Sequence, residues 1–367
     1  MNKENLHKLI DKYEENFYFI NNKDHDEIFK WRAFRRFREV WFSDKAKEKP
    51  FSEMFNEARK EFFILMDNKS VCPSSGIVKV AEHEQEAVAN LFNNVLFADD
   101  GGDIIARQNN IDLFVEKFNK LCAEYYPKSY KFKQDRHSAS CYLAMFAPDK
   151  NYIYRHGEVD AFAQHVEFGK DIGSGKNFRL DYYYEMCDQI VEALKEHKSL
   201  LEKHFTFINE KHYKDESLHI LAFDIIYCSK VYKFYLGMQH KAKKESIKAF
   251  KEFELREKER IERENAIAEL ENEIYELENK IEQYRDISLV NVEVEHYKYG
   301  KGIVEAQELN QITVQFKDYK KVLSIHKKFF KFFTLEDNDF IFEAMTEYED
   351  VTKQIEKLKD KLSVYYK

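Results

Sequence analysis

Residues 256–286 read REKERIERENAIAELENEIYELENKIEQYRD, and this stretch decides how the last third of the chain is organised. Its apolar residues recur at alternating spacings of three and four, which is the heptad pattern of a coiled-coil helix. They are Ile267, Leu270, Ile274, Leu277, Ile281 and Tyr284. Because charged and polar residues fill the positions between them, we expect a long exposed helix with one narrow apolar seam.

A short β module interrupts the helical pattern between residues 290 and 333. Apolar and polar residues alternate there, as they do in half-buried strands, and Gly300 and Gly302 mark a turn. The strands that we expect are Val290–His296, Ile303–Val304 after the glycine turn, Ile312–Phe316 and Val322–Ile325. Several short strands in so few residues favour a small SH3-like or Tudor-like β-barrel over a sandwich.

Helical spacing returns near Asn338. The apolar residues of this second helix are Ile341, Met345, Tyr348, Val351, Ile355, Leu358, Leu362 and Tyr365. We therefore predict a coiled-coil helical hairpin that carries the barrel at its tip. Two pairings are consistent with the pattern: Ile267–Tyr284 packs antiparallel on Ile355–Tyr365 of the same chain, or two chains form a homodimer through the coiled coil.

The composition favours a mainly helical protein of two or three domains. The chain has 367 residues, of which 44% are hydrophobic, and only 4 Pro and 10 Gly, so long helices are expected. The predicted fold class is mainly α, of α+β type. The predicted domains are a helical N-terminal domain over 1–235 with a short strand near 151–155, a long coiled-coil helix over 236–288, the SH3-like barrel over 289–335 and a C-terminal helix over 336–367.

Charge and cysteine content restrict the class of protein. The formal net charge of −8 gives no overall cationic field, so any nucleic-acid contact needs a local basic patch. The five cysteines are widely spread without a CxxC pair, which argues against a zinc ribbon. No signal-peptide pattern and no run of about 18 apolar residues occurs, so we expect a cytoplasmic protein with no membrane partner.

The N-terminal domain contains one strongly basic helix, at Phe29–Phe42. Its aromatic residues at helical spacing are Trp31, Phe34, Phe37 and Trp41, and its arginines are Arg32, Arg35, Arg36 and Arg38. One interpretation is that the arginines lie against phosphates. The sequence favours the other, a core helix whose arginines are solvated or paired, because acidic residues are plentiful. Further helices are expected at Phe51–Met66 and Ala81–Phe97, with a turn at Cys72–Gly76 between them.

The β module is the most basic part of the chain. Residues 290–333 contain eight lysines and five acidic residues, a net charge of +3 against −8 for the whole chain. The candidate contact residues for nucleic acid or a partner are Lys298, Lys301, Lys317, Lys320, Lys321, Lys327 and Lys328, together with Arg32, Arg35 and Arg36. The alternative is that the lysines only maintain solubility and protect strand edges.

No catalytic pattern is complete. Gly169–Asn177 reads GKDIGSGKN, but a phosphate loop needs glycine where Lys170 stands and a hydroxyl residue where Asn177 stands. Asp99–Asp103 offers three carboxylates without the closing Glu of a calcium loop, and is expected to cap the next helix. We therefore predict no catalytic residue, no metal ligand and no cofactor, and favour a protein that is not an enzyme.

Two parts of the chain resemble known families. Lys30–Phe42, followed about a hundred residues later by Ser140–Arg155, resembles the uncharacterised N-terminal module of McrB-type restriction ATPases and related phage-defence proteins. Val294–His296, the turn Tyr299–Val304 and Ile312–Phe316 resemble the C-terminal barrel of superfamily-one DNA repair helicases and the barrel of CarD-type transcription regulators. In those families the barrel binds RNA polymerase or other proteins, and sometimes contributes to nucleic-acid contact.

These observations predict a non-enzymatic adaptor. The first hypothesis is a nucleic-acid-associated recognition component, of the kind found in bacterial phage-defence or restriction systems, whose basic barrel contacts the nucleic-acid backbone. The second is a protein–protein scaffold that dimerises, or recruits a polymerase or nuclease, through the coiled coil and the barrel. The partner is accordingly nucleic acid or a nucleic-acid-processing protein.

Overall fold

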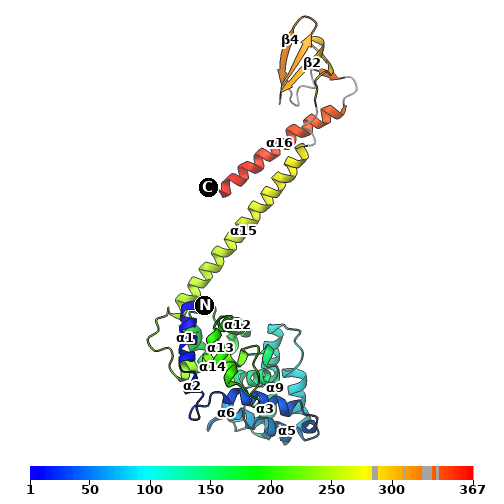
Figure 1. Ribbon diagram of the computed structural model, residues 1–367. Coiled ribbons are helices and arrows are strands. Elements are labelled where there is room, and N and C mark those ends of the chain that lie inside the picture. Colours follow the sequence, from blue (N-terminus) through cyan, green and yellow to red (C-terminus); the bar gives the residue numbers. More distant parts are fainter. Residues whose placement is uncertain (283–287, 309–310, 325–332, 336–338, 367) are drawn as a thin grey trace. The chain divides into compact units, whose positions relative to one another are not determined.

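The computed structural model describes residues 1–282, 288–308, 311–324, 333–335 and 339–366. It is mainly helical, with one small antiparallel sheet formed by residues of the last quarter of the chain (Figure 1). The chain divides into two units, Met1–Glu252 and Phe253–Lys367, which are described separately. None of the described helices combines the length and the apolar character that a membrane span requires.

Unit 1 (Met1–Glu252) is built from helices around one aromatic core. Its helices are α1 (Lys3–Glu15), α2 (Phe17–Ile20), α3 (Phe29–Trp41), α4 (Asp44–Lys47), α5 (Phe51–Ala58), α6 (Phe63–Met66), α7 (Pro73–Ala81), α8 (Gln85–Leu91), α9 (Ile104–Tyr125), α10 (Arg136–Phe146), α11 (His156–His165), α12 (Leu180–Glu196), α13 (Lys198–Phe207) and α14 (His219–Val231). A π-helical turn, Phe92–Leu96, follows α8. The expected cap of the ninth helix is confirmed, because the Asp103 carboxylate accepts hydrogen bonds from the N–H groups of Ile105 and Ala106.

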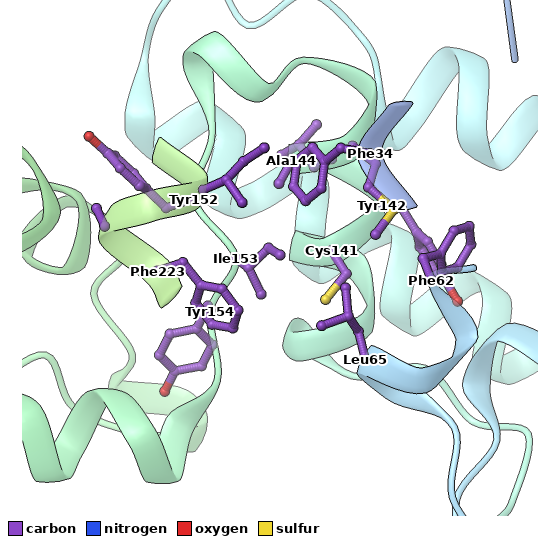
Figure 2. Close-up of a cluster of buried hydrophobic side chains, with 14 of the residues drawn as sticks. Phe34, Phe62, Leu65, Cys141, Tyr142, Ala144, Tyr152, Ile153, Tyr154 and Phe223 are labelled. Carbon is purple, nitrogen blue, oxygen red and sulfur yellow. The ribbon is translucent and has the colours of Figure 1, made fainter. Parts of the chain in front are cut away.

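Helix α3 lies inside this core. Trp31, Phe34 and Phe37 are fully or almost fully buried, so the predicted inward-facing aromatic stripe is confirmed. Figure 2 shows Phe34 beside the side chains of α10, where Tyr142 also packs against Phe62 with ring centroids 6.0 Å apart. Aromatic side chains therefore fill much of the space between these helices, together with the aliphatic residues of the same core.

Two predictions for unit 1 are wrong. Residues 151–155 form no strand: the chain is extended there, but the N–H of Tyr154 donates to Ser140 Oγ at 2.9 Å instead of to a strand carbonyl. Tyr152 and Tyr154 are both buried among helices (Figure 2), so no sheet is available to pair with them. Cys72–Gly76 is also not a free turn, because Pro73 begins α7, where its fixed φ suits the first helical position.

Unit 2 (Phe253–Lys367) contains most of α15 (Lys243–Glu282) and all of α16 (Asp339–Tyr365). The two helices run antiparallel and share an apolar seam. Its buried members are Ile274, Val351, Ile355 and Leu358, with Leu270, Leu277, Ile281 and Leu362 partly buried around them. Lys359 pairs with Glu278 at 2.6 Å across the seam. The seam is thus filled within one chain, which is the first of the two predicted pairings; Tyr284 lies outside the described residues.

The sheet of unit 2 has five antiparallel strands. They are β1 (Glu293–His296), β2 (Gly300–Glu308), β3 (Gln311–Phe316), β4 (Lys320–Ser324) and β5 (Phe333–Leu335), in the order β4-β3-β2-β1-β5. Each expected strand is found, with bounds that differ by a few residues; Ile325, the predicted end of the fourth, lies outside the described residues. Among the described strands β4 and β5 do not pair, so closure into a barrel is not seen. Leu289, Val294, Val304, Ile312, Val314 and Phe316 form the small core.

Both glycines of the predicted turn have a structural reason. Gly300 has φ +77°, a conformation that residues with a side chain rarely adopt. Gly302 pairs with Phe316, and a Cβ on it would lie 2.7 Å from Val314 Cγ1 and 2.8 Å from the Gln315 carbonyl oxygen. The strands β2 and β3 therefore pack closely only because position 302 lacks a side chain.

Gly302→Ala is expected to destabilise the sheet by roughly 1–3 kcal/mol, since the Gln315 backbone oxygen cannot move away without breaking the ladder. Hydrogen exchange of the Val304 and Val314 amides measures this directly, and their protection should fall. Exchange in unit 1 should not change. Lys301→Ala, at the exposed neighbouring position, serves as the control; equal protection in both variants would contradict the packing argument.

Candidate nucleic-acid interface

Five rings gather at one end of the sheet and form what we call the aromatic platform: His296, Tyr297, Tyr299, Phe316 and Tyr319. The ring of Tyr299 stacks on His296 at 4.5 Å and lies 5.6 Å from Phe316 and 6.1 Å from Tyr319. The pairings of His296 with Gly300 and of Gly302 with Phe316 bring these rings together. The platform is therefore a product of strand register.

The platform presents aromatic surface to solvent. Tyr297 is 72% exposed and Tyr319 44% exposed, whereas His296 and Phe316 are buried beneath them. Tyr299, half-buried, links the exposed rings to the core of the sheet. Exposed rings on a rigid support lose little conformational entropy when a planar group stacks on them.

Two lysines flank the platform. Lys321 Nζ donates a hydrogen bond to Tyr299 Oη at 2.9 Å and lies 4.3 Å from the centre of the same ring, and Lys298 Nζ lies 5.7 Å from it. The hydrogen bond raises the pKa of Lys321 and lowers the pKa of Tyr299. Burial, with the two lysines, lowers the pKa of His296. At neutral pH the platform is thus cationic through its lysines and not through its histidine.

The other predicted lysines are placed differently. Lys301 precedes Gly302 and Lys317 follows Phe316, so both lie at the same end of the β2–β3 ladder. Neither makes an ion pair within the described part of the chain. Lys320 is paired with Glu305 at 2.6 Å. Lys327 and Lys328 lie outside the described residues.

Three of the four arginines of α3, those predicted as contact residues, are paired with carboxylates, and the fourth, Arg38, donates to the Phe146 carbonyl oxygen. Arg32 pairs with Asp26 at 2.5 Å and lies 3.8 Å from Glu61. Arg35 pairs with Glu39 at 2.6 Å and Arg36 with Glu57 at 2.5 Å, all in partly exposed positions. Of the two interpretations of this helix, the arrangement favours a core helix with paired arginines and not a surface that binds phosphates.

A buried charge network occupies the one cluster of potential metal ligands among the described residues. Glu27, Asp224 and Cys228 lie close together, but the Lys30 ammonium fills the space between the two carboxylates, 2.6 Å from Asp224 and bonded to Glu27. Burial alone lowers the pKa of Lys30, but Asp224 and Glu27 outweigh it and raise the pKa overall. The cluster holds its own cation and needs no metal.

The glycine segment 169–177 does not form a phosphate loop. It ends in a short 3₁₀ turn, Gly175–Asn177, and no strand precedes it in this fully described region. Asp171 in this segment pairs with Lys243 at 3.1 Å. The departure from the phosphate-loop sequence is therefore matched by a departure in structure.

The sequence indicated the lysines of this site but not the aromatic platform beside them. Tyr297 and Tyr299 alternate with Lys298 before the glycine turn, and Tyr319 follows Asp318 in the next turn. Tyrosines that lie in turns beside lysines are the feature of the sequence that could have indicated the platform. No protein-family model, curated protein or solved structure matches the chain. The resemblances to McrB-type modules, helicase barrels and CarD-type barrels therefore stay predictions.

Proposed function

We propose that the sheet of unit 2 binds nucleic acid without strong sequence preference, with bases stacked on the aromatic platform and phosphates held by Lys298 and Lys321. The observation that carries the proposal is the contact of both ammonium groups with one ring, Tyr299, beside the exposed rings of Tyr297 and Tyr319. Stacking surface and adjoining cations are the two parts of a site for single-stranded nucleic acid.

The energies expected of such a site are moderate. Each base stacked on an aromatic side chain contributes about 1–3 kcal/mol, and each phosphate contact makes affinity fall as salt rises. A net charge of −8 on the whole chain confines binding to the local positive region around the sheet. The proposed role is that of a cytoplasmic adaptor, such as a recognition component of a bacterial phage-defence or restriction system, whose sheet belongs to an SH3-like or Tudor-like barrel.

Binding of the full-length protein to labelled single-stranded and duplex DNA and RNA at several salt concentrations tests this proposal. Lys298→Glu with Lys321→Glu should weaken binding at low salt by at least about tenfold and flatten its salt dependence, because phosphate contacts are lost. Tyr297→Ala combined with Tyr319→Ala should weaken the binding of single-stranded nucleic acid more than the binding of duplex.

The matched control is Lys357→Glu with Lys361→Glu on α16, which changes the net charge by the same amount away from the sheet. Binding by this variant should differ little from that of the parent protein. No binding at low salt, or an equal loss in the control, would reject the platform as a nucleic-acid site.

A second candidate is a protein–protein scaffold. Ile303 and Val322 are 51% and 60% exposed, and both lie on the outer face of the sheet, opposite the core residues of β2 and β3. Exposed aliphatic side chains on a sheet fit a protein partner, such as a polymerase or nuclease, better than a phosphate backbone. Salt-insensitive capture of a protein, abolished by Ile303→Asp and not by the lysine changes, would favour this alternative.

A further inference from the structure

A cleft of about 530 Å³ opens on unit 1 where α5, α6 and the start of α7 come together. Its chemically informative walls are Arg59, Lys60, Phe63, Asp67, Lys69 and Ser75. The proposed role of the sheet does not use any of these residues. The volume lies within the range of about 300–1,000 Å³ that small-molecule sites occupy.

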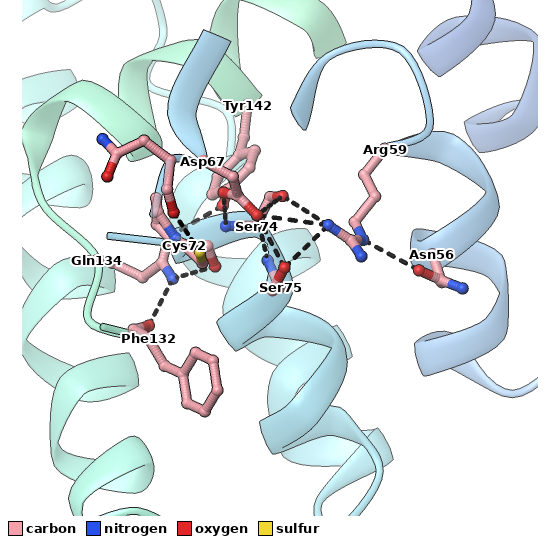
Figure 3. Close-up of polar contacts among 11 residues, drawn as sticks. Asn56, Arg59, Asp67, Cys72, Ser74, Ser75, Phe132, Gln134 and Tyr142 are labelled. Carbon is pink, nitrogen blue, oxygen red and sulfur yellow. Dashed lines mark hydrogen bonds and ion pairs between the residues drawn. The ribbon is translucent and has the colours of Figure 1, made fainter. Parts of the chain in front are cut away.

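The floor of the cleft is an arginine held in a fixed orientation. Arg59 Nε donates to Asn56 Oδ1 at 3.0 Å, and Nη1 donates to the hydroxyls of Ser74 and Ser75, both at 3.1 Å (Figure 3). Within the part of the chain that the structure describes, Nη2 donates to no acceptor. One edge of the guanidinium is thus oriented by the protein and still has hydrogen-bond donors to offer.

Among the described residues that line the cleft, Asp67 is the only carboxylate, and it is fully engaged. It accepts hydrogen bonds from the backbone N–H groups of Ser74 (2.9 Å) and Ser75 (3.1 Å) and from both hydroxyls, and Arg59 lies 3.4 Å away (Figure 3). Asp67 thereby satisfies the N-terminus of α7 and offsets one positive charge. An incoming anion would meet the cations of the wall and not the helix end.

The rim adds two ammonium groups and a ring. Lys60 is exposed, and its nearest carboxylate, Glu57, is 4.0 Å away; Lys69 makes no ion pair among the described residues. Phe63 exposes 40% of its surface at the same cleft. Three cations against one buried carboxylate leave the wall with a net charge of +2, beside an aromatic surface.

We propose that this cleft binds a mononucleotide, with the phosphate held by Lys60, Lys69 and the Nη2 edge of Arg59, and the base stacked on Phe63. A planar arginine and flexible lysines suit phosphate oxygens, and an exposed phenylalanine accepts the face of any base. The ligand differs from the nucleic acid proposed for the sheet in both size and site.

Calorimetric titration of the full-length protein with each of the four ribonucleoside 5′-monophosphates tests the assignment, with adenosine and inorganic phosphate as partial ligands. At least one monophosphate should bind in a saturable manner, at least about tenfold more tightly than adenosine or phosphate alone. Lys60→Ala with Lys69→Ala should reduce its affinity at least about tenfold, and Phe63→Ala by a similar factor.

Lys117→Ala, an exposed lysine on α9, is the matched control and should leave the affinity unchanged. The Lys298→Glu and Lys321→Glu variant should also bind the mononucleotide normally, which separates this site from the sheet. Absence of saturable binding by all four monophosphates would overturn the proposal. So would an affinity that survives the double lysine change, or equal binding of phosphate and mononucleotide.

Discussion

Lys30→Met is expected to lower the free energy of unfolding of unit 1 by about 3–5 kcal/mol, several times what the loss of an exposed ion pair costs. Lys30 is completely buried, and its ammonium lies between the carboxylates of Glu27 and Asp224. Methionine fills a similar volume without the charge, so the packing is largely kept. What is lost is the compensation of two buried negative groups.

The rest of the network prevents the two carboxylates from adjusting to the loss of the Lys30 ammonium. Tyr13 Oη donates to Asp224 at 2.5 Å and Tyr232 Oη donates to Glu27 at 2.7 Å, so both carboxylates are fixed in place. They cannot turn toward solvent when the ammonium is removed. A buried charge without a partner costs far more than an exposed ion pair contributes.

Urea unfolding followed by tryptophan fluorescence measures this effect, because both tryptophans of the chain, Trp31 and Trp41, belong to unit 1. Lys8→Met, at an exposed ion pair of α1, is the matched control and should change stability by less than about 1 kcal/mol. Removing Lys30 and Asp224 together should cost less than removing Lys30 alone. A loss below about 1 kcal/mol for Lys30→Met would mean that the network is not a stabilising unit.

The second large effect is a loss of stability in acid caused by His204. Its side chain is completely buried, packs against Trp31 with ring centroids 4.9 Å apart, and neither ring nitrogen has a hydrogen-bond partner among the described residues. Burial, with a smaller contribution from His212, lowers the pKa of His204 from 6.5 to about 4. The folded protein therefore keeps this imidazole neutral in mild acid.

The direction of the pH effect follows from the two protonation states. Between pH 6.5 and about 4 the unfolded chain binds a proton at His204 that the folded chain does not. The contribution of neutral His204 to the free energy of unfolding is complete above pH 6.5. It is lost as the pH falls from 6.5 to about 4, by about 3 kcal/mol in total. The free energy of unfolding of His204→Leu should therefore change less between about pH 7.5 and about pH 4.5 than that of the parent protein.

The exposed His83→Leu variant controls for the loss of any one histidine, and His204→Leu should differ from the parent protein more than this control does. Other groups contribute to acid unfolding, but they contribute equally to both proteins in the comparison. An identical pH dependence in the parent and in His204→Leu would show that burial does not hold this ring neutral.

The features that could be predicted from the sequence are those that depend on local periodicity. The seam at Leu270, Ile274 and Leu277 and the strands around the glycine turn follow from spacings of a few residues, and the inward stripe of α3 follows from helical geometry. These features need no knowledge of distant parts of the chain. The failed strand at 151–155 shows the limit, because an apolar run can equally be an extended segment buried among helices.

The candidate sites depended on distant contacts. Lys30 lies in the predicted basic helix, but its buried ion pair depends on Asp224, which is far along the chain and could not be identified from local spacing. The aromatic platform required the β1–β2 and β2–β3 registers, which alternation alone does not fix. The cleft required Pro73 to begin a helix where a turn was expected, so that Ser74 and Ser75 meet Arg59.

The insertion of the sheet between α15 and α16 leads us to expect a particular order of folding. Glu278 and Lys359 meet across the seam although 81 positions separate them, and the whole sheet lies between them in the chain. The strands β1 to β4 each pair with a neighbour in sequence, so they close short loops and are expected to form early. The helices then have a compact loop to close instead of a long disordered one. We therefore expect the sheet to fold before the helices pair, so that mutations which slow its formation also slow the pairing of α15 with α16.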